Sequence, residues 1–208
     1  MLMKWCKNKE VLDFGCGFGG FIKGMQDVAK CICGVEISTT ERNYLTVEGI
    51  SVENKIEKFG KKFDVITLFH VFEHLFNPRE WLTTFANYIK EDGMLFIEVP
   101  NANDALLSLY ESPAFADFTY WSAHLYLYTK ESLIKIINDN GCFEIEEAGQ
   151  FQRYPLSNHL YWLSKGKPGG QNKWQFLNSE ILNKEYTRML EEANLCDTLL
   201  FRLRKKSV

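Results

Sequence analysis

The feature that most constrains the fold of this chain is a glycine-rich turn that directly follows a short apolar segment. The segment EVLDF is followed by GCGFGG, so Gly15, Gly17 and Gly20 satisfy the spacing GxGxxG, and Gly15, Gly17 and Gly19 satisfy GxGxG. Such glycines let the backbone approach a ligand closely where a buried strand turns into a helix. The turn therefore predicts a ligand-binding α/β unit, but alone it does not identify the ligand.

Apolar runs alternate with helical periodicity over most of the chain. The runs lie at 9–14, 31–38, 49–54, 62–71, 93–100, 142–151 and 197–206. Strands that alternate with helices at this spacing indicate a parallel sheet buried on both faces. We predict a doubly wound, Rossmann-like α/β fold. It has a seven-stranded, mostly parallel sheet, helices on both faces and an insertion between strands six and seven.

Helix boundaries are marked by capping residues. Ser38 and Glu41 predict a capping box, and Asn77-Pro78 predicts the start of a helix that Asp92-Gly93 ends. Thr129 and Gly141 bound a further predicted helix. These signals divide the chain into the same alternating units as the apolar runs.

Two segments interrupt the alternation. We expect 101–128 to be a long aromatic loop, and such loops are usually functional. Its aromatic residues are expected either to stack on a substrate as a lid or to belong to the core. The insertion, 152–196, carries a GKPGG hinge and an amphipathic helix near 178–193. We interpret 1–208 as a single domain. Because its first strand begins within about ten residues of Met1, we expect either a natural short form or a truncated chain, in which both segments supply substrate contacts.

Composition excludes several classes of function. The 24 basic and 27 acidic residues give a net charge of −3, so no nucleic-acid partner is expected. No apolar run reaches the roughly 18 residues of a membrane span, and the first residues do not form a signal pattern. Six cysteines without a zinc-ribbon spacing fit reduced thiols. We therefore expect a cytoplasmic protein that does not bind membranes.

Two acidic residues narrow the choice of ligand. Glu36 ends the second strand, where a carboxylate can accept both hydrogens of a ribose diol. Asp13 lies two residues before the first glycine, where it would repel a pyrophosphate but would attract an ammonium group. S-adenosylmethionine has an ammonium group and no phosphate. The residues therefore favour this cofactor over NAD.

The motifs together resemble a known family. Asp13-Phe14-Gly15-Cys16-Gly17-Phe18-Gly19, then Val35-Glu36, then FDVITLFHVFEHLFNP are similar to the signature segments of class I S-adenosylmethionine-dependent methyltransferases. The Glu73-His74-Leu75 stretch resembles the branch that contains ubiquinone- and menaquinone-type and many small-molecule enzymes. The resemblance covers residues 10–150.

The resemblance implies a set of cofactor contacts and a product, S-adenosylhomocysteine. The cofactor-binding residues it implies are Asp13, Gly15, Cys16, Gly17, Gly19, Glu36, Ile37, Phe69 and His70. Where the family often has an acidic adenine contact, this chain has VENKIEK, so Glu53 or Asn54 is the candidate there.

Methyl transfer to an oxygen also requires that a proton be removed. His124 lies in the aromatic loop over the strand ends, His70 ends the fourth strand, and His74 follows one turn later. We predict these three histidines as catalytic candidates, with His124 first. Structural alternatives stay open for each: a lining for the cofactor, a bond to the backbone, or an anchor for the loop.

The acceptor is expected to be a small molecule. QRYPLSNHLYWLSKGKPGG in the insertion resembles segments of methyltransferase-like proteins from bacterial surface-polysaccharide gene clusters, which implies a hydroxyl of a sugar or sugar nucleotide. A quinone-like acceptor, an NAD-dependent oxidoreductase or epimerase, and a non-catalytic cofactor-binding module are the alternatives.

Three further expectations concern charge, metals and assembly. The basic residues of the insertion, Arg153, Lys165, Lys167 and Lys173, form either a solvated face or a grip for a phosphate or carboxylate. No metal site is expected, because Asn101 and Asp104 poorly match the acidic set of catechol methyltransferases. The insertion is a possible homodimer contact.

Overall fold

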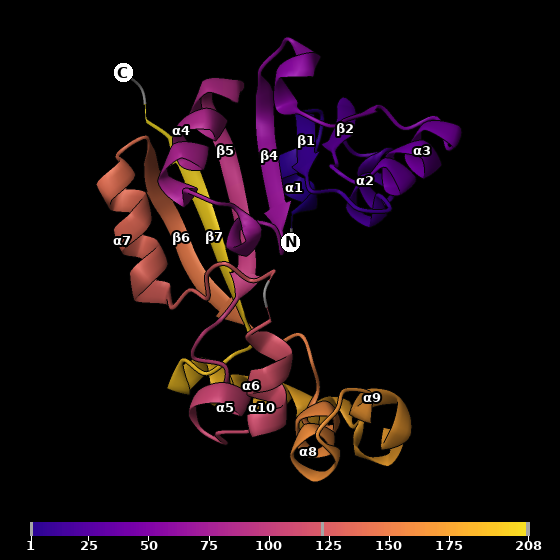
Figure 1. Cartoon of the computed structure of the whole chain (residues 1–208), viewed down its shortest axis with the longest axis vertical. Helices are drawn as coiled ribbons and strands as arrows, with labels where there is room; N and C mark the ends of the chain where they lie inside the picture. Colours follow the sequence, from indigo (N-terminus) through magenta and orange to yellow (C-terminus); the bar gives the residue numbers. More distant parts are fainter. Residues whose placement is uncertain (1, 122, 207–208) are drawn as a thin grey trace.

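The computed structural model describes residues 2–121 and 123–206, so residue 122 of the predicted aromatic loop lies outside the description. Its centre is one seven-stranded sheet with the strand order β3-β2-β1-β4-β5-β7-β6 (Figure 1). The strands are β1 Glu10–Phe14, β2 Cys31–Val35, β3 Val52–Glu53, β4 Phe63–Phe69, β5 Ile89–Pro100, β6 Phe143–Phe151 and β7 Thr198–Lys205.

Only β7 runs against its neighbours. The pairs β1–β2, β1–β4, β2–β3 and β4–β5 are parallel, whereas β7 pairs antiparallel with both β5 and β6. The predicted fold class is therefore confirmed. Because the chain order reverses between β1 and β4, the carboxyl ends of these two strands border the crevice in which open α/β sheets bind ligands.

Helices cover both faces of the sheet. The larger core lies under α4 (Pro78–Tyr88) and α7 (Lys130–Asn140), where Leu82, Phe85 and Leu133 are fully buried. The other face is covered by α1 (Met3–Cys6) and α2 (Gly20–Met25). The helix α3 (Thr39–Val47) follows β2. Among the described residues, no helix combines the length and apolar character that crossing a bilayer requires.

Two predicted helix signals are wrong in detail. Ser38 is the N-cap residue of α3, but its side chain makes no capping bond, and its backbone N–H donates to Glu36 Oε1 rather than to Glu41. The helix α4 ends at Tyr88 rather than at Asp92-Gly93, which lie within β5. In contrast, the capping box of Thr129 and the left-handed Gly141 bound α7 as predicted.

The predicted loop and the insertion form a helical cap beyond the carboxyl ends of the strands, below the sheet in Figure 1. Residues 101–128 are not an irregular loop, because they contain α5 (Ala105–Ser108) and α6 (Pro113–Thr119). The insertion contains α8 (Leu156–Lys165), α9 (Gly170–Lys173), η3 (Gln175–Leu177) and the predicted amphipathic helix α10 (Glu180–Ala193). Two short 3₁₀ turns, η1 (Ile56–Phe59) and η2 (Phe72–His74), flank β4.

Candidate active site

The glycine turn after β1 is built so that side chains are excluded. Gly15, Gly17 and Gly19 have φ values of +76°, +51° and +74°. A Cβ atom on Gly15 would lie 2.3 Å from the Cγ2 atom of Val71, and one on Gly19 would lie 2.6 Å from Leu45. The turn therefore packs directly against the residue that follows His70, which brings the predicted cofactor loop to the end of β4.

The backbone amides of this turn are bonded within the chain. The N–H groups of Gly15 and Cys16 donate to the carbonyl of Val35 at 2.8 and 3.1 Å, and that of Gly17 donates to Glu36 Oε2 at 2.9 Å. A pyrophosphate at a turn of this kind is held by amide donors of the loop. Because these amides have partners and a carboxylate lies at Gly17, the turn suits a cofactor without phosphate.

Glu36 is held in place by two backbone donors. Its Oε2 accepts from Gly17 and its Oε1 accepts from Ser38 at 2.9 Å, and the residue is 9% exposed. An ionised carboxylate offers about four acceptor positions. Two positions are therefore left for the two hydroxyls of a ribose.

Asp13 is buried at 4% exposure between β1 and β4. Its Oδ1 accepts the hydroxyl proton of Thr67 at 2.8 Å. Burial raises the pKa of Asp13 to about 7; the Thr67 bond opposes this shift, and the nearby Glu36 adds to it. A cationic group placed beside Asp13 would reverse the cost of its ionisation.

The other predicted cofactor residues differ in how exposed their side chains are and in what these side chains contact. The Cys16 side chain packs against Gly34 and is 7% exposed, so only its backbone faces the turn. Ile37 is 85% exposed, and Phe69 packs edge-on against Phe21. Asn54 Oδ1 is buried and has no hydrogen-bond partner in the described part of the chain. That orphan acceptor fits an adenine amino group.

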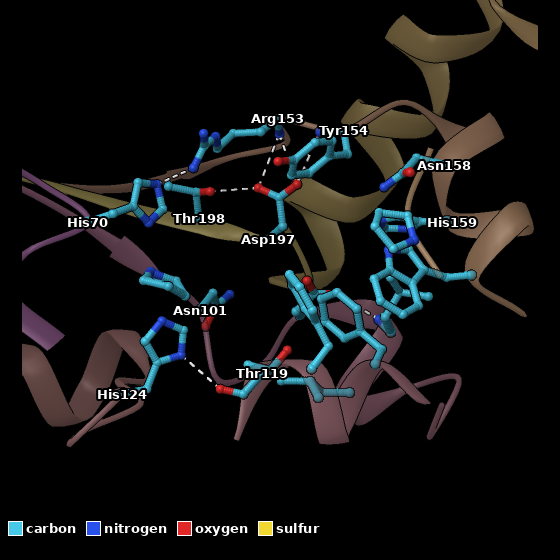
Figure 2. A pocket seen from close by; sticks show the side chains of 18 of the residues that line it. His70, Asn101, Thr119, His124, Arg153, Tyr154, Asn158, His159, Asp197 and Thr198 are labelled. Carbon is cyan, nitrogen blue, oxygen red and sulfur yellow. Dashed lines mark hydrogen bonds between the residues drawn. The ribbon is translucent and has the colours of Figure 1, made fainter. Parts of the chain in front are cut away.

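A cavity of about 240 Å³ opens beside this region (Figure 2). Its walls come from the end of β4, from residues 100–124 and from the insertion. Phe115 and Phe118 of α6 and Trp162 of α8 form its apolar wall, with ring centroids 5.1 to 6.1 Å apart. The predicted aromatic group therefore divides: these two phenylalanines line the cavity, Tyr128 is core at 2% exposure, and Trp121 is 54% exposed.

The polar wall is organised by Asp197, which precedes β7. This carboxylate accepts the backbone N–H groups of Arg153 and Tyr154 and the hydroxyl of Thr198, as Figure 2 shows. Burial raises the pKa of Asp197, and the Thr198 bond opposes that shift. Asp197 thus fixes the start of the insertion over the cavity, and the sequence contained no local signal for it.

Two more polar residues of the cavity have perturbed titration. Burial raises the pKa of Asp104 to about 7, and burial lowers the pKa of His159 to about 4. His159 is 1% exposed, and its Nδ1 lies 2.8 Å from the Tyr186 hydroxyl. His159 is therefore a neutral imidazole that forms part of the cavity wall.

His70 stands at the junction of the glycine turn and the cavity. It has a φ of +54°, an uncommon left-handed conformation for a residue other than glycine. Its Nε2 is 3.1 Å from Glu98 Oε1 and also contacts the Arg153 guanidinium, and its Nδ1 is 3.6 Å from Glu73. Burial opposes protonation of His70, but the nearby carboxylates of Glu73 and Glu98 outweigh it and raise the pKa of His70.

Arg153 is the member of the predicted basic group that reaches the site. It is exposed, lines the cavity and touches His70, whereas Lys165, Lys167 and Lys173 do not line the cavity. Its backbone bond to Asp197 directs it there. Which of the four basic residues lines the cavity depends on tertiary structure and could not be read from composition.

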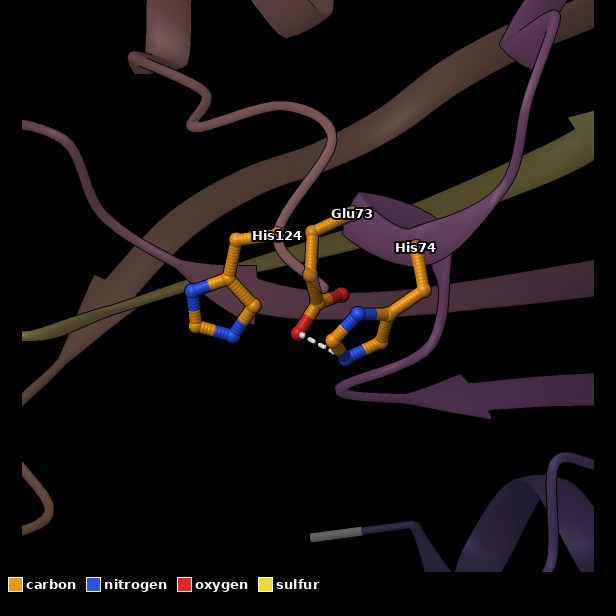
Figure 3. A group of neighbouring side chains, drawn as sticks. All are labelled: Glu73, His74 and His124. Carbon is orange, nitrogen blue, oxygen red and sulfur yellow. Dashed lines mark ion pairs between the residues drawn. The ribbon is translucent and has the colours of Figure 1, made fainter. Parts of the chain in front are cut away.

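His74 and His124 face each other across Glu73 (Figure 3), with ring centroids 5.0 Å apart. The Nδ1 of His74 lies 2.6 Å from the carbonyl of Ala123, and the Nδ1 of His124 lies 2.8 Å from that of Thr119. Both predicted histidines are thus bonded to the backbone. Glu73, which the sequence indicated only as part of the Glu-His-Leu motif, is fully buried between them.

Comparison with known proteins agrees with this geometry. Residues 6–147 match the family model described as "Methyltransferase domain". A ubiquinone biosynthesis O-methyltransferase of Glaesserella parasuis is 32% identical over 108 residues, which cover 45% of this chain and 46% of that protein. The match therefore spans about half the length of the curated relative.

Solved structures with low sequence identity share the fold. An S-adenosylmethionine-dependent methyltransferase from Mesorhizobium loti has a TM-score of 0.63 at 15% identity, covering 97% of this chain and 93% of that one. A mycolic acid cyclopropane synthase in complex with S-adenosylhomocysteine has a TM-score of 0.59 at 15% identity, with coverage of 96% and 79%.

Proposed function

This chain belongs to the methyltransferase domain family, and from that premise we propose that it transfers a methyl group from S-adenosylmethionine to a hydroxyl of a small molecule. One observation carries the proposal: the glycine turn packs on Val71, so a cofactor held by the turn lies beside the cavity that begins at His70. Membership of this family also weighs against an oxidoreductase or epimerase, which would use the same glycines.

We assign the cofactor contacts as follows. Glu36 would accept the ribose hydroxyls, Asp13 would pair with the cationic methionyl end, and the buried Asn54 Oδ1 would accept the adenine amino group. Phe69 would line the methionyl path next to Phe21. When bound, the cofactor supplies an electrophilic methyl carbon on a sulfonium.

The chain then has to align the acceptor oxygen, exclude water and remove one proton. The oxygen–methyl bond forms as the carbon–sulfur bond breaks, and S-adenosylhomocysteine leaves as a neutral thioether. We place proton removal at one of the three predicted histidines: His124 or His74, which lie beside Glu73, or His70, which stands where the glycine turn meets the cavity.

A hydroxyl of a sugar or sugar nucleotide is the acceptor we propose. The cavity combines an aromatic wall, Phe115, Phe118 and Trp162, with the amide of Asn158, whose Oδ1 is held by Gly169 and Gly170 and whose Nδ2 is left to donate. An aromatic face can cover the C–H side of a sugar ring while amides bond its hydroxyls. Arg153 adds a cation at the cavity that suits a phosphate of a sugar nucleotide.

A quinone-like phenol is the second candidate. Its support is the name of the relatives, ubiquinone biosynthesis O-methyltransferases, of which this chain matches about half. A phenolic ring would stack on the same aromatic wall, but it would leave Arg153 without an anionic partner.

Transfer of a labelled methyl group distinguishes the two. The protein is incubated with methyl-labelled S-adenosylmethionine and, separately, with a panel of nucleotide-activated sugars and a catechol-type quinone precursor. We expect label in the sugar nucleotides. Label in the catechol alone would contradict the sugar assignment, and binding of S-adenosylhomocysteine without transfer to any acceptor would favour a non-catalytic module.

A further inference from the structure

Glu73 is a buried carboxylate that lacks a hydrogen-bond partner. Its side chain is 1% exposed, and neither of its carboxylate oxygens has a partner among the residues that the structure describes. Its nearest cationic candidates are His70 Nδ1 at 3.6 Å and His74 Nε2 at 3.8 Å, both beyond hydrogen-bond distance. Burying carboxylate oxygens without hydrogen-bond partners is costly, so this position suits a group that would bond them.

The two histidines beside Glu73 are oriented in the manner of metal ligands. Each gives its Nδ1 proton to a backbone carbonyl, that of Ala123 or of Thr119. In the neutral ring this leaves the lone pair on Nε2. A bond from the second ring nitrogen to a carbonyl is the usual outer support of a metal-bound histidine, because it fixes the ring and its tautomer.

The three side chains converge within coordination range. One oxygen of Glu73 and one nitrogen each of His74 and His124 lie within 4.8 Å of one another (Figure 3). Ligand atoms about 2.0–2.2 Å from a tetrahedral zinc ion are about 3.3 Å apart. A contraction of up to about 1.5 Å would therefore close the site around an ion.

The backbone holds both halves of this group together. His74 and Glu73 belong to η2 at the end of β4, whereas His124 comes from a segment 50 residues later. The N–H of Tyr126 donates to the carbonyl of Glu73 at 3.1 Å, and the rings of Phe72 and Tyr128 pack at 5.7 Å. These contacts hold the two segments next to each other without an ion.

We propose that Glu73, His74 and His124 form a binding site for a divalent transition-metal ion, with zinc as the best match. Two imidazoles and one carboxylate suit zinc or iron(II) and disfavour magnesium and calcium, which prefer oxygen ligands. All three residues line the cavity, so the open coordination position faces the acceptor. This proposal departs from the expectation of no metal that was drawn from the sequence.

The role of the ion rests on the proposed function, although the site does not. An ion in this place would bind the acceptor hydroxyl, lower its pKa and orient it toward the cofactor side of the cavity. His124 would then act as a ligand rather than as a general base.

Metal binding can be measured without any acceptor. Chelator-treated protein is titrated with zinc chloride by calorimetry and with cobalt(II) by visible absorption, beside Glu73→Gln, His124→Ala and the control His159→Gln. His159 lines the same cavity but faces Tyr186. Loss of an outer-shell partner costs about 10–100-fold in metal affinity, so loss of a ligand should cost at least that.

We expect one zinc ion per chain in the native protein and in His159→Gln, weak or no binding in the other two variants, and no comparable binding of magnesium. Equal zinc binding in all proteins, or none in native protein that still binds S-adenosylhomocysteine, would overturn the site. Undiminished methyl transfer by chelated native protein would overturn only the role of the ion.

Discussion

Replacement of Gly15 by alanine puts one methyl group where the glycine turn meets the end of β4. The new Cβ would lie 2.3 Å from Val71 Cγ2 and 3.1 Å from Val71 Cγ1, at a backbone φ of +76°. The left-handed backbone costs an L-residue about 1–2 kcal/mol. Because valine is stiff about χ1, overpacking adds about 1–3 kcal/mol. The free energy of unfolding should therefore fall by about 2–5 kcal/mol.

Gly17→Ala is the matched control for this prediction. Gly17 also has a positive φ, +51°, but an added Cβ meets no atom within 4 Å. Only the backbone cost of about 1–2 kcal/mol should appear there. The double variant Gly15→Ala/Val71→Ala, compared with Val71→Ala alone, should recover the overpacking part.

Urea and thermal unfolding of these four variants give the assay. For a chain of this size about 1 kcal/mol corresponds to about 2–4 °C in Tm, so Gly15→Ala should melt roughly 10 °C lower and Gly17→Ala only a few degrees lower. Equal losses in Gly15→Ala and Gly17→Ala, or no recovery on removing the Val71 methyl groups, would refute the packing of the turn on Val71.

Three further predictions concern the cofactor and the acceptor. Burial raises the pKa of Asp13 to about 7, so its carboxylate gains a proton as the pH falls through 7. Calorimetry should therefore show about tenfold weaker cofactor binding at pH 6 than at pH 8. The variant Asp13→Asn should abolish this pH dependence. Glu36→Ala should weaken S-adenosylhomocysteine binding by more than about tenfold, since it removes two charge-assisted ribose bonds; unchanged affinity would refute the assignment. Arg153→Ala should raise the KM for a nucleotide sugar about tenfold and leave the KM for the cofactor unchanged. Lys165 lies in the same insertion but away from the cavity, so Lys165→Ala should change neither KM.

Much of the fold could be predicted because its signals are local. The apolar runs around Leu12 and Ile66 and the capping residue Thr129 act within a few residues of themselves, and each has the predicted role. The end of α4 was wrong because β4 pairs with β5 from Ile89 onward, and this strand pairing outweighs the turn signal of Asp92-Gly93.

The site was less predictable because its chemistry is assembled from distant segments. The sequence identified Asp13, Glu36 and the three histidines, but it could not show that Glu73 lies buried between two of them. Asp197 gave no signal, since its partners at 153 and 154 lie more than 40 residues away. Burial and convergence of this kind are properties of the folded chain.

The central claim is that the glycine turn, Glu36 and Asp13 hold S-adenosylmethionine. The most direct test is calorimetric titration of the protein with S-adenosylhomocysteine and, in a separate experiment, with NADH. S-adenosylhomocysteine should bind with one molecule per chain. NADH should give no measurable heat, because the amides of the turn are already bonded and the carboxylates of Glu36 and Asp13 repel a pyrophosphate. Tight binding of NADH without binding of S-adenosylhomocysteine would contradict it.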